Sequence, residues 1–140
     1  MATDRSPTPR DDGGKLLLRL TLGGLMLLHG IAKLAGGVGG IEKMLGGIGL
    51  PPAFAYGAFV GEVVAPVLLL LGLWTRLAAI VVAINMVFAV FLAHRDQLFT
   101  LAKTGGWALE LQGFFFFTAI AVLLLGAGRY SMGGVNGRWN

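Results

Sequence analysis

The sequence contains no cysteine among its 140 residues. This absence excludes disulfides, thiolate nucleophiles, iron–sulfur clusters and covalently attached haem. The sequence also has no Gly-x-Gly-x-x-Gly nucleotide loop. Electrons for any redox reaction would therefore have to come from a partner subunit or a soluble donor.

Charge is also scarce. Only 13% of the residues are charged and 56% are hydrophobic, which gives a mean hydropathy of +0.78. A soluble domain of this size could not bury so much apolar surface, so a lipid bilayer is the expected solvent. The net charge of +4 comes from basic residues at the ends of apolar runs, as in topology signals. It does not indicate nucleic-acid binding.

Four long apolar segments follow a polar start. They cover residues 16–35, 53–73, 77–93 and 107–126, with 20, 21, 17 and 20 residues. A bilayer core takes about 17–25 helical residues, and continuous apolar runs in lipid form helices. The predicted fold is all-α, a polytopic four-transmembrane-helix bundle. It divides into a disordered head (1–15), a transmembrane domain (16–131) and a tail (132–140). The first run has no small-residue cleavage site, so we expect an uncleaved first span.

The loops predict an orientation and an extra helix. With four spans, seven basic residues lie on the side of the termini and four on the other, which predicts cytoplasmic termini in a bacterial plasma (inner) membrane. The glycine-rich loop 36–52 carries an apolar stripe at helical spacing, formed by Ile41, Met44, Leu45 and Ile48. This pattern predicts a short amphipathic helix on the outer interface, able to act as a lid, or a loop with an apolar face.

Polar residues interrupt the predicted spans. Arg19, His29 and Lys33 fall on one stripe of the first helix, so His29 and Lys33 face the same way. At 1.5 Å per residue, His29 lies about 9 Å, Asn85 about 12 Å and Glu62 about 14 Å from the outer helix ends. All three therefore lie in the outer half of the bundle.

Glu62 is the deepest of these residues. An ionisable residue at that depth costs about 2.5–3.5 kcal/mol on insertion scales. We expect Glu62 to pair with His29 or Lys33, or to stay protonated. The tie is either purely structural or part of a functional pocket. Pro66, one turn later, frees a backbone carbonyl and favours a kink.

Several other polar residues have simpler interpretations. Lys33 and Arg19 could extend to the two membrane surfaces, with Arg19 meeting a phosphate. Asn85 could join two helices. His94 and Arg95 begin a loop, where we expect them to be solvated.

Glu110 lies only about 4–5 Å deep, near a helix start where acidic residues are favoured. Together with His29 and Glu62 it offers ligand types suited to a metal. Their depths, however, span about 10 Å, so no metal site is predicted. The candidates for ligand binding or proton exchange are His29, Lys33, Glu62, Asn85 and Glu110, and no catalytic residue is assigned.

The order of these motifs resembles the DoxX family of small four-helix membrane proteins. "HGIAKL", a glycine-rich loop ending in "GLP", a mid-helix Glu, "GLWTRLAA" and "GAGRYS" occur in sequence. The matching residues are Arg19, Gly23, His29, Gly30, Lys33, Gly49, Leu50, Pro51, Glu62, Gly72, Arg76, Ala78, Ala79, Gly126, Gly128, Arg129 and Ser131. The family's final motif usually reads Gly-Pro-Gly-Arg and continues to an Asp, which this chain lacks.

The resemblance implies a role in membrane redox systems. The family is named after a subunit associated with quinone-linked oxidase or thiosulfate oxidation, and other members are linked to redox-stress complexes. We therefore expect an accessory subunit that binds quinone in the outer-half pocket and works with a redox partner or soluble donor. A small-solute transport element, which four helices could form as a homo-oligomer, and a membrane scaffold without catalysis are the alternatives.

Overall fold

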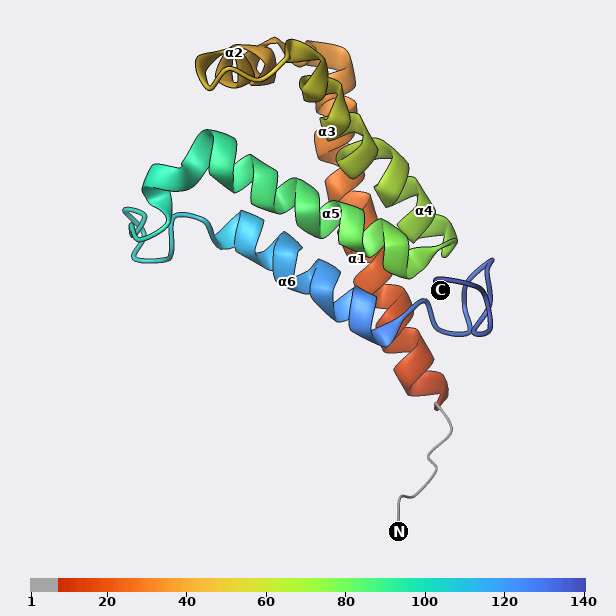
Figure 1. Ribbon diagram of the computed structural model, residues 1–140. Helices are drawn as coiled ribbons and strands as arrows, with labels where there is room; N and C mark the ends of the chain where they lie inside the picture. Colours follow the sequence, from red (N-terminus) through yellow and green to blue (C-terminus); the bar gives the residue numbers. More distant parts are fainter. Residues whose placement is uncertain (1–7) are drawn as a thin grey trace.

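The computed structural model describes residues 8–140, and this part of the chain is helical with no β-strand. The helix α1 (Pro9–Gly36) leads to the short α2 (Gly39–Gly47) (Figure 1). The next helix is continuous and consists of η1 (Pro52–Tyr56), α3 (Gly57–Phe59), η2 (Val60–Val64) and α4 (Ala65–Leu71). It is followed by α5 (Thr75–Ala89), which continues as η3 (Val90–His94) and η4 (Arg95–Gln97), and by α6 (Glu110–Leu125).

Within residues 8–140, three helices are long and apolar enough to cross a membrane: Pro9–Gly36, Pro52–Leu71 and Thr75–Gln97. The prediction of an all-helical membrane protein is confirmed. The last apolar segment forms a helix of only 16 residues, α6, because the three residues before it belong to a loop. At about 24 Å this helix is shorter than a typical hydrocarbon core. The crossing by α6 stays a prediction.

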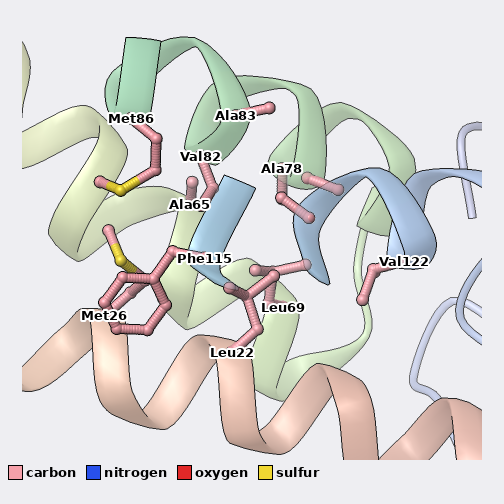
Figure 2. Close-up of a cluster of buried hydrophobic side chains, with 12 residues drawn as sticks. Leu22, Met26, Ala65, Leu69, Ala78, Val82, Ala83, Met86, Phe115 and Val122 are labelled. Atoms are coloured by element: carbon pink, nitrogen blue, oxygen red, sulfur yellow. The ribbon is translucent and has the colours of Figure 1, made fainter. Parts of the chain in front are cut away.

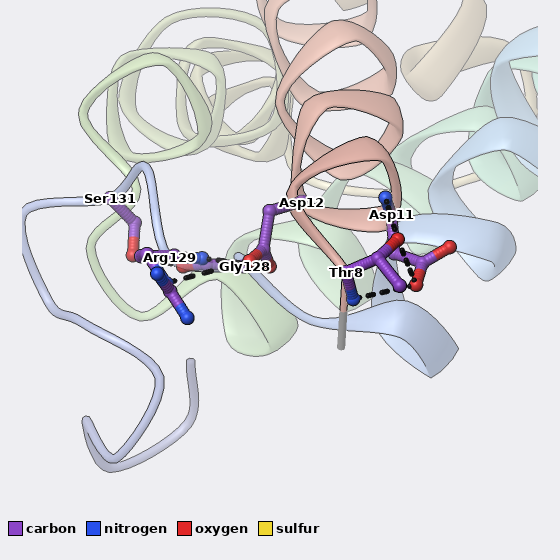
Figure 3. A network of polar contacts seen from close by, with 6 residues as sticks. All are labelled: Thr8, Asp11, Asp12, Gly128, Arg129 and Ser131. Atoms are coloured by element: carbon purple, nitrogen blue, oxygen red, sulfur yellow. Dashed lines mark hydrogen bonds and ion pairs between the residues drawn. The ribbon is translucent and has the colours of Figure 1, made fainter. Parts of the chain in front are cut away.

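The start of α1 differs from the sequence-based expectation. The helix begins at Pro9, whereas a disordered head was predicted to extend to residue 15; residues 1–7 lie outside the described part. Thr8 and Asp11 form a reciprocal capping box: the Thr8 amide donates to Asp11 Oδ2 at 2.8 Å, and Thr8 Oγ1 accepts from the Asp11 amide (Figure 3). This cap and the proline at the first helical position stabilise a polar first turn that hydropathy does not detect.

The helices enclose one main core. α5 and α6 pack side by side along their length, and α1 packs against α4 and η2 (Figure 1). Leu22 and Met26 of α1, Leu69 of α4, Val82 of α5 and Val122 of α6 meet between them (Figure 2). Small residues on α5 let the neighbouring helices approach closely. The outer faces stay apolar: Leu28 of α1 is 62% exposed and Phe114 of α6 is 74% exposed, as expected for contact with lipid.

The residues after α6, 126–140, form a C-terminal segment that closes the end of the bundle away from α2 (Figure 1). The side chain of Asn140 accepts hydrogen bonds from the Thr75 amide and hydroxyl at 3.2 and 2.9 Å. Arg76 donates to the backbone oxygens of Asn140 and Leu123 at 3.0 and 2.8 Å. Residues 132–140, predicted to be a separate tail, are therefore tied to the turn between α4 and α5.

The same segment covers Arg19. Its side chain was expected to extend to the membrane surface, but it is 2% exposed and donates from Nη2 to the Tyr130 backbone oxygen at 2.6 Å. Gly72, with φ +69°, leaves room for the guanidinium, because a Cβ at this position would overlap it. The expectation is wrong because residues after α6 fold back across α1 and enclose the guanidinium.

A second contact joins the two ends of the described chain. Asp12, 2% exposed, accepts from the Arg129 backbone amide at 3.1 Å, and the Arg129 Nε atom lies 3.7 Å from Asp12 Oδ2 (Figure 3). The start of α1 and the segment after α6 therefore lie together at one end of the bundle.

Candidate functional site

Three polar residues from three different helices meet at one point. Glu62 lies in η2, Lys33 in the last turn of α1 and Asn85 in α5. Lys33 Nζ forms an ion pair with Glu62 Oε2, and Asn85 Nδ2 donates to Glu62 Oε1 at 3.1 Å. The Glu62 side chain is 5% exposed and the Lys33 side chain 31% exposed. Both oxygens of the Glu62 carboxylate therefore accept a hydrogen bond, and the Lys33 side chain stays partly exposed at the protein surface.

Two glycines allow this arrangement. A Cβ on Gly30 would lie 2.7 Å from the Glu62 carbonyl carbon, so α1 and η2 approach backbone to backbone. A Cβ on Gly61 would lie 2.5 Å from Asn85 Cγ, so the amide rests directly on the backbone of η2. Any side chain at either position would push Glu62 away from its partners.

The turn that carries Glu62 is a π-turn. The Ala65 amide donates to the Val60 carbonyl, five residues back. Pro66 has no amide hydrogen, and its ring crowds the carbonyl four residues earlier, which belongs to Glu62. The wider turn relieves this conflict, and π-turns of this kind occur often at functional sites. Pro66 was predicted to favour a kink, and the structure has a change of helix type, from α to π, over Val60–Val64 just before it.

A cavity of about 670 Å³ opens beside these three residues. Its walls come from α2, from η1 to η2, and from α5 with η3. The polar lining consists of Lys33, Glu62, Asn85 and, on η3, His94. All other lining side chains are apolar or glycine: Ile41, Met44, Leu45, Leu50, Phe54, Ala55, Gly57, Ala58, Gly61, Val81, Ile84, Phe88, Ala89, Leu92 and Ala93. The result is an apolar slot with one strongly polar wall.

The helix α2 covers part of this slot. It forms over Gly39–Gly47, within the stretch where an amphipathic helix was predicted. Leu45 is 3% exposed and packs with Val38 and Ala55, whereas Met44 faces the cavity. Part of the apolar stripe therefore faces the protein interior and the cavity, whereas Ile48 is 42% exposed. The placement of α2 on the membrane surface stays a prediction.

Two of the predicted site residues lie elsewhere. His29 is exposed and places its ring edge-on to Phe115 of α6, with centroids 5.7 Å apart. Glu110 is exposed at the start of α6, beside Gly106. Neither makes a hydrogen bond to Glu62 in the described chain. Over the same residues, no group of three or more His, Cys, Asp or Glu side chains could hold a metal ion.

His94 is a lining residue that the sequence did not single out. Its Nδ1 atom is buried and has no hydrogen-bond partner among residues 8–140. Nine residues separate it from Asn85, which is about 13 Å along the helix. Its position at the end of an apolar run predicted a solvated loop residue. The π-turn of η3 and the cover of α2, neither of which has a clear sequence signal, place it on the cavity wall instead.

A family model for DoxX matches residues 14–95, which include Lys33, Glu62 and Asn85. The chain belongs to the DoxX family. The family match thus contains the whole cavity wall, whereas α6 and the C-terminal segment lie beyond it.

Two curated relatives match part of this DoxX protein. A Bacillus subtilis protein named "Putative oxidoreductase CatD" is 36% identical over 77 residues, which cover 55% of this chain and 57% of the relative. A Haemophilus influenzae protein named "Uncharacterized protein" is 33% identical over 92 residues, 64% of this chain and 67% of the relative. The chain thus spans little more than half the length of the Bacillus subtilis relative. No solved structure matches significantly.

Proposed function

We propose that this DoxX protein is an accessory subunit of a membrane redox system and binds a quinone in the cavity beside Glu62. The observation that carries the proposal is an apolar slot whose polar wall holds a carboxylate, an ammonium group and an amide. A quinone has a flat apolar ring with two carbonyl oxygens, and Lys33 and Asn85 are the hydrogen-bond donors in reach of such a ring.

The proposed chemistry concerns protons. Reducing a quinone to a quinol takes two electrons and two protons. The electrons come from a partner subunit or soluble donor, because this cysteine-free sequence has no iron–sulfur or nucleotide motif to carry them. The Glu62 carboxylate takes up a proton from the aqueous side and passes it to a quinone oxygen, once for each of the two protons, while Lys33 orients the carboxylate between transfers. The name of the Bacillus subtilis relative supports a redox role.

The proposed setting is a bacterial plasma membrane with both termini in the cytoplasm. The excess of basic residues near the termini and the turn after α4 supports this orientation. The contact between Asp12 and Arg129 supports placing both termini on one side, whichever side that is, because α6 then has to return the chain to the side where α1 began. In this setting α2 lies at the outer surface and the cavity in the outer half of the bilayer.

The test separates binding from proton transfer. Decylubiquinone binding to the purified protein is measured by equilibrium titration, and quinone reduction is measured in membranes of a deletion strain complemented with each variant. Glu62→Gln keeps the side-chain volume and one acceptor oxygen for Lys33, and the Asn85 amide can turn its own oxygen toward the new NH2 group, but the variant cannot exchange a proton at neutral pH. We expect it to bind decylubiquinone and to lower the reduction rate by about 100-fold or more.

Glu110→Gln is the matched control, because it changes the same residue type outside the cavity. It should behave as wild type. Full activity of Glu62→Gln would overturn the proton role. If wild type does not bind decylubiquinone, quinone binding is wrong; uptake of a small solute into proteoliposomes would then favour transport, and co-purification of an enzyme without any ligand would favour a scaffold.

A further inference from the structure

A second hollow lies on the opposite side of α5. It has a volume of about 420 Å³ and runs between the end of α5 and the start of α6. Its α5 residues are Met86 and Val87. They lie about half a helical turn from Phe88 and Asn85, respectively, which line the cavity beside Glu62. The two hollows are therefore separate, and the function proposed above does not use this groove.

The walls of the groove are fixed by specific contacts. Trp107 donates from Nε1 to the Leu98 backbone oxygen at 2.8 Å, which holds the indole across one end. Gly113 makes room for this ring, because a Cβ there would lie 2.7 Å from Trp107 Cζ3. Phe116 and Phe117 extend the apolar wall along α6. The result is an apolar groove with the fixed Trp107 indole at one end.

The polar groups of the groove are at the same end as the indole. Arg95 follows directly after η3, and its Cζ atom lies 5.8 Å from the centre of the Phe91 ring. Gln112 lies in the first turn of α6. Neither ion pair found within residues 8–140 involves Arg95, so its positive charge is not neutralised by a carboxylate there. The groove thus combines an apolar channel with one cation at a helix end.

We propose that this groove binds an anionic phospholipid, with an acyl chain along α5 and α6 and the phosphate at Arg95. Helix ends and tryptophan side chains lie at the level of lipid headgroups, so the position of the cation matches that of a phosphate. The guanidinium offers the fork of donors that phosphate oxygens accept, and Gln112 is a further donor for the ester region. A zwitterionic lipid fits the channel equally but gains less from Arg95.

The experiment uses the full-length protein, delipidated in detergent and offered an equimolar mixture of palmitoyl-oleoyl phosphatidylglycerol and phosphatidylcholine. Native mass spectrometry counts the retained lipids. Wild type should retain one phosphatidylglycerol with a preference of about fivefold or more over phosphatidylcholine. Arg95→Gln should bring the preference close to parity, and Val90→Phe, which fills the channel, should reduce both lipids.

Lys103→Gln is the matched control, since Lys103 is basic and lies in the same loop region but does not line the groove. It should keep the preference. Thermal unfolding shows whether each variant remains folded, and an unfolded Val90→Phe would be replaced by Val90→Leu. Equal loss in Lys103→Gln and Arg95→Gln would mean diffuse surface charge and overturn the proposal. The proposal would also be overturned if Arg95→Gln kept the preference for phosphatidylglycerol. Displacement of the lipid by glycerol 3-phosphate alone, or a lipid-free dimer that covers the groove, would overturn it as well.

Discussion

Residues without side chains shape the candidate site as much as the charged ones do. Gly30 and Gly61 are the two points where neighbouring helices contact the backbone of η2. The ion pair of Lys33 with Glu62 and the hydrogen bond from Asn85 depend on that close approach. The geometry of the site is therefore most sensitive at the glycines.

Gly30→Ala tests this dependence. Its Cβ would meet the Glu62 carbonyl and Val63, so α1 has to move away from η2, and we expect a loss of about 1–3 kcal/mol in the free energy of unfolding. Gly24→Ala, in the same helix, is the control because nothing lies within 4 Å of its Cβ. That variant should be neutral or more stable by up to about 1 kcal/mol. Denaturant unfolding in detergent measures both; equal effects would contradict the close approach.

The sequence predicts part of the site well. The depth of Glu62 in a long apolar run identifies it as a residue that needs a partner, and Lys33 was one of the two partners considered. The choice between Lys33 and His29 could not be made, because helical rise gives depth but not rotation between helices. The rotation of Glu62 depends on the π-turn that Pro66 favours, and the sequence indicates such a turn only as a kink.

At the level of the element, the first helix shows what hydropathy misses. Residues 9–15 are polar, yet they are helical because Thr8 caps the first turn and Asp11 returns the hydrogen bond. The apolar interior of α1 was predicted from composition, whereas its start depends on a local pairing of two side chains. Hydropathy also fails to predict the start of α6. This helix begins at Glu110, after the loop in which Trp107 donates a hydrogen bond to the Leu98 backbone oxygen.

Thr8→Ala should shorten α1. Removing the hydroxyl leaves the Asp11 amide without its acceptor, which costs about 0.5–2 kcal/mol of local helix stability. Hydrogen exchange of the amides in residues 9–15 should then speed up, while exchange deeper in α1 stays unchanged. Thr21→Ala is the matched control, since Thr21 lies inside the same helix and plays no part in the cap. Unchanged exchange at the start of the helix in Thr8→Ala would show that the cap is unimportant.

On the scale of the whole molecule, the distinctive feature is the closure of one end by the C-terminal segment. Asp12, Arg19, Thr75 and Arg76 all contact residues after α6. The presence of long apolar helices followed from the sequence, but this closure did not. Two of these four contacts are accepted by backbone oxygens, those of Tyr130 and Asn140, which carry no residue pattern. The partners are also far apart in the chain.

Asp12→Ala should loosen this closure. The variant removes the carboxylate acceptor of the Arg129 amide and the nearby guanidinium contact, so a partly buried hydrogen bond to a charged group is lost at a cost of about 1.5–3 kcal/mol. We expect faster trypsin cleavage at Arg129 and Arg138 in detergent. Asp11→Ala is the control, because this neighbouring carboxylate caps α1 and makes no contact with the C-terminal segment. Equal cleavage rates in the two variants would show that Asp12 does not hold the segment.

The contact between Arg19 and Tyr130 joins residues that are 111 positions apart. During translation, Arg19 leaves the ribosome long before the segment that encloses it. Until the segment after α6 has been synthesised and has folded back, this guanidinium lacks the Tyr130 acceptor and has to be solvated in another way. The burial of this charge inside the bundle is therefore a late event for α1, because it depends on a residue that follows the last apolar helix in the sequence.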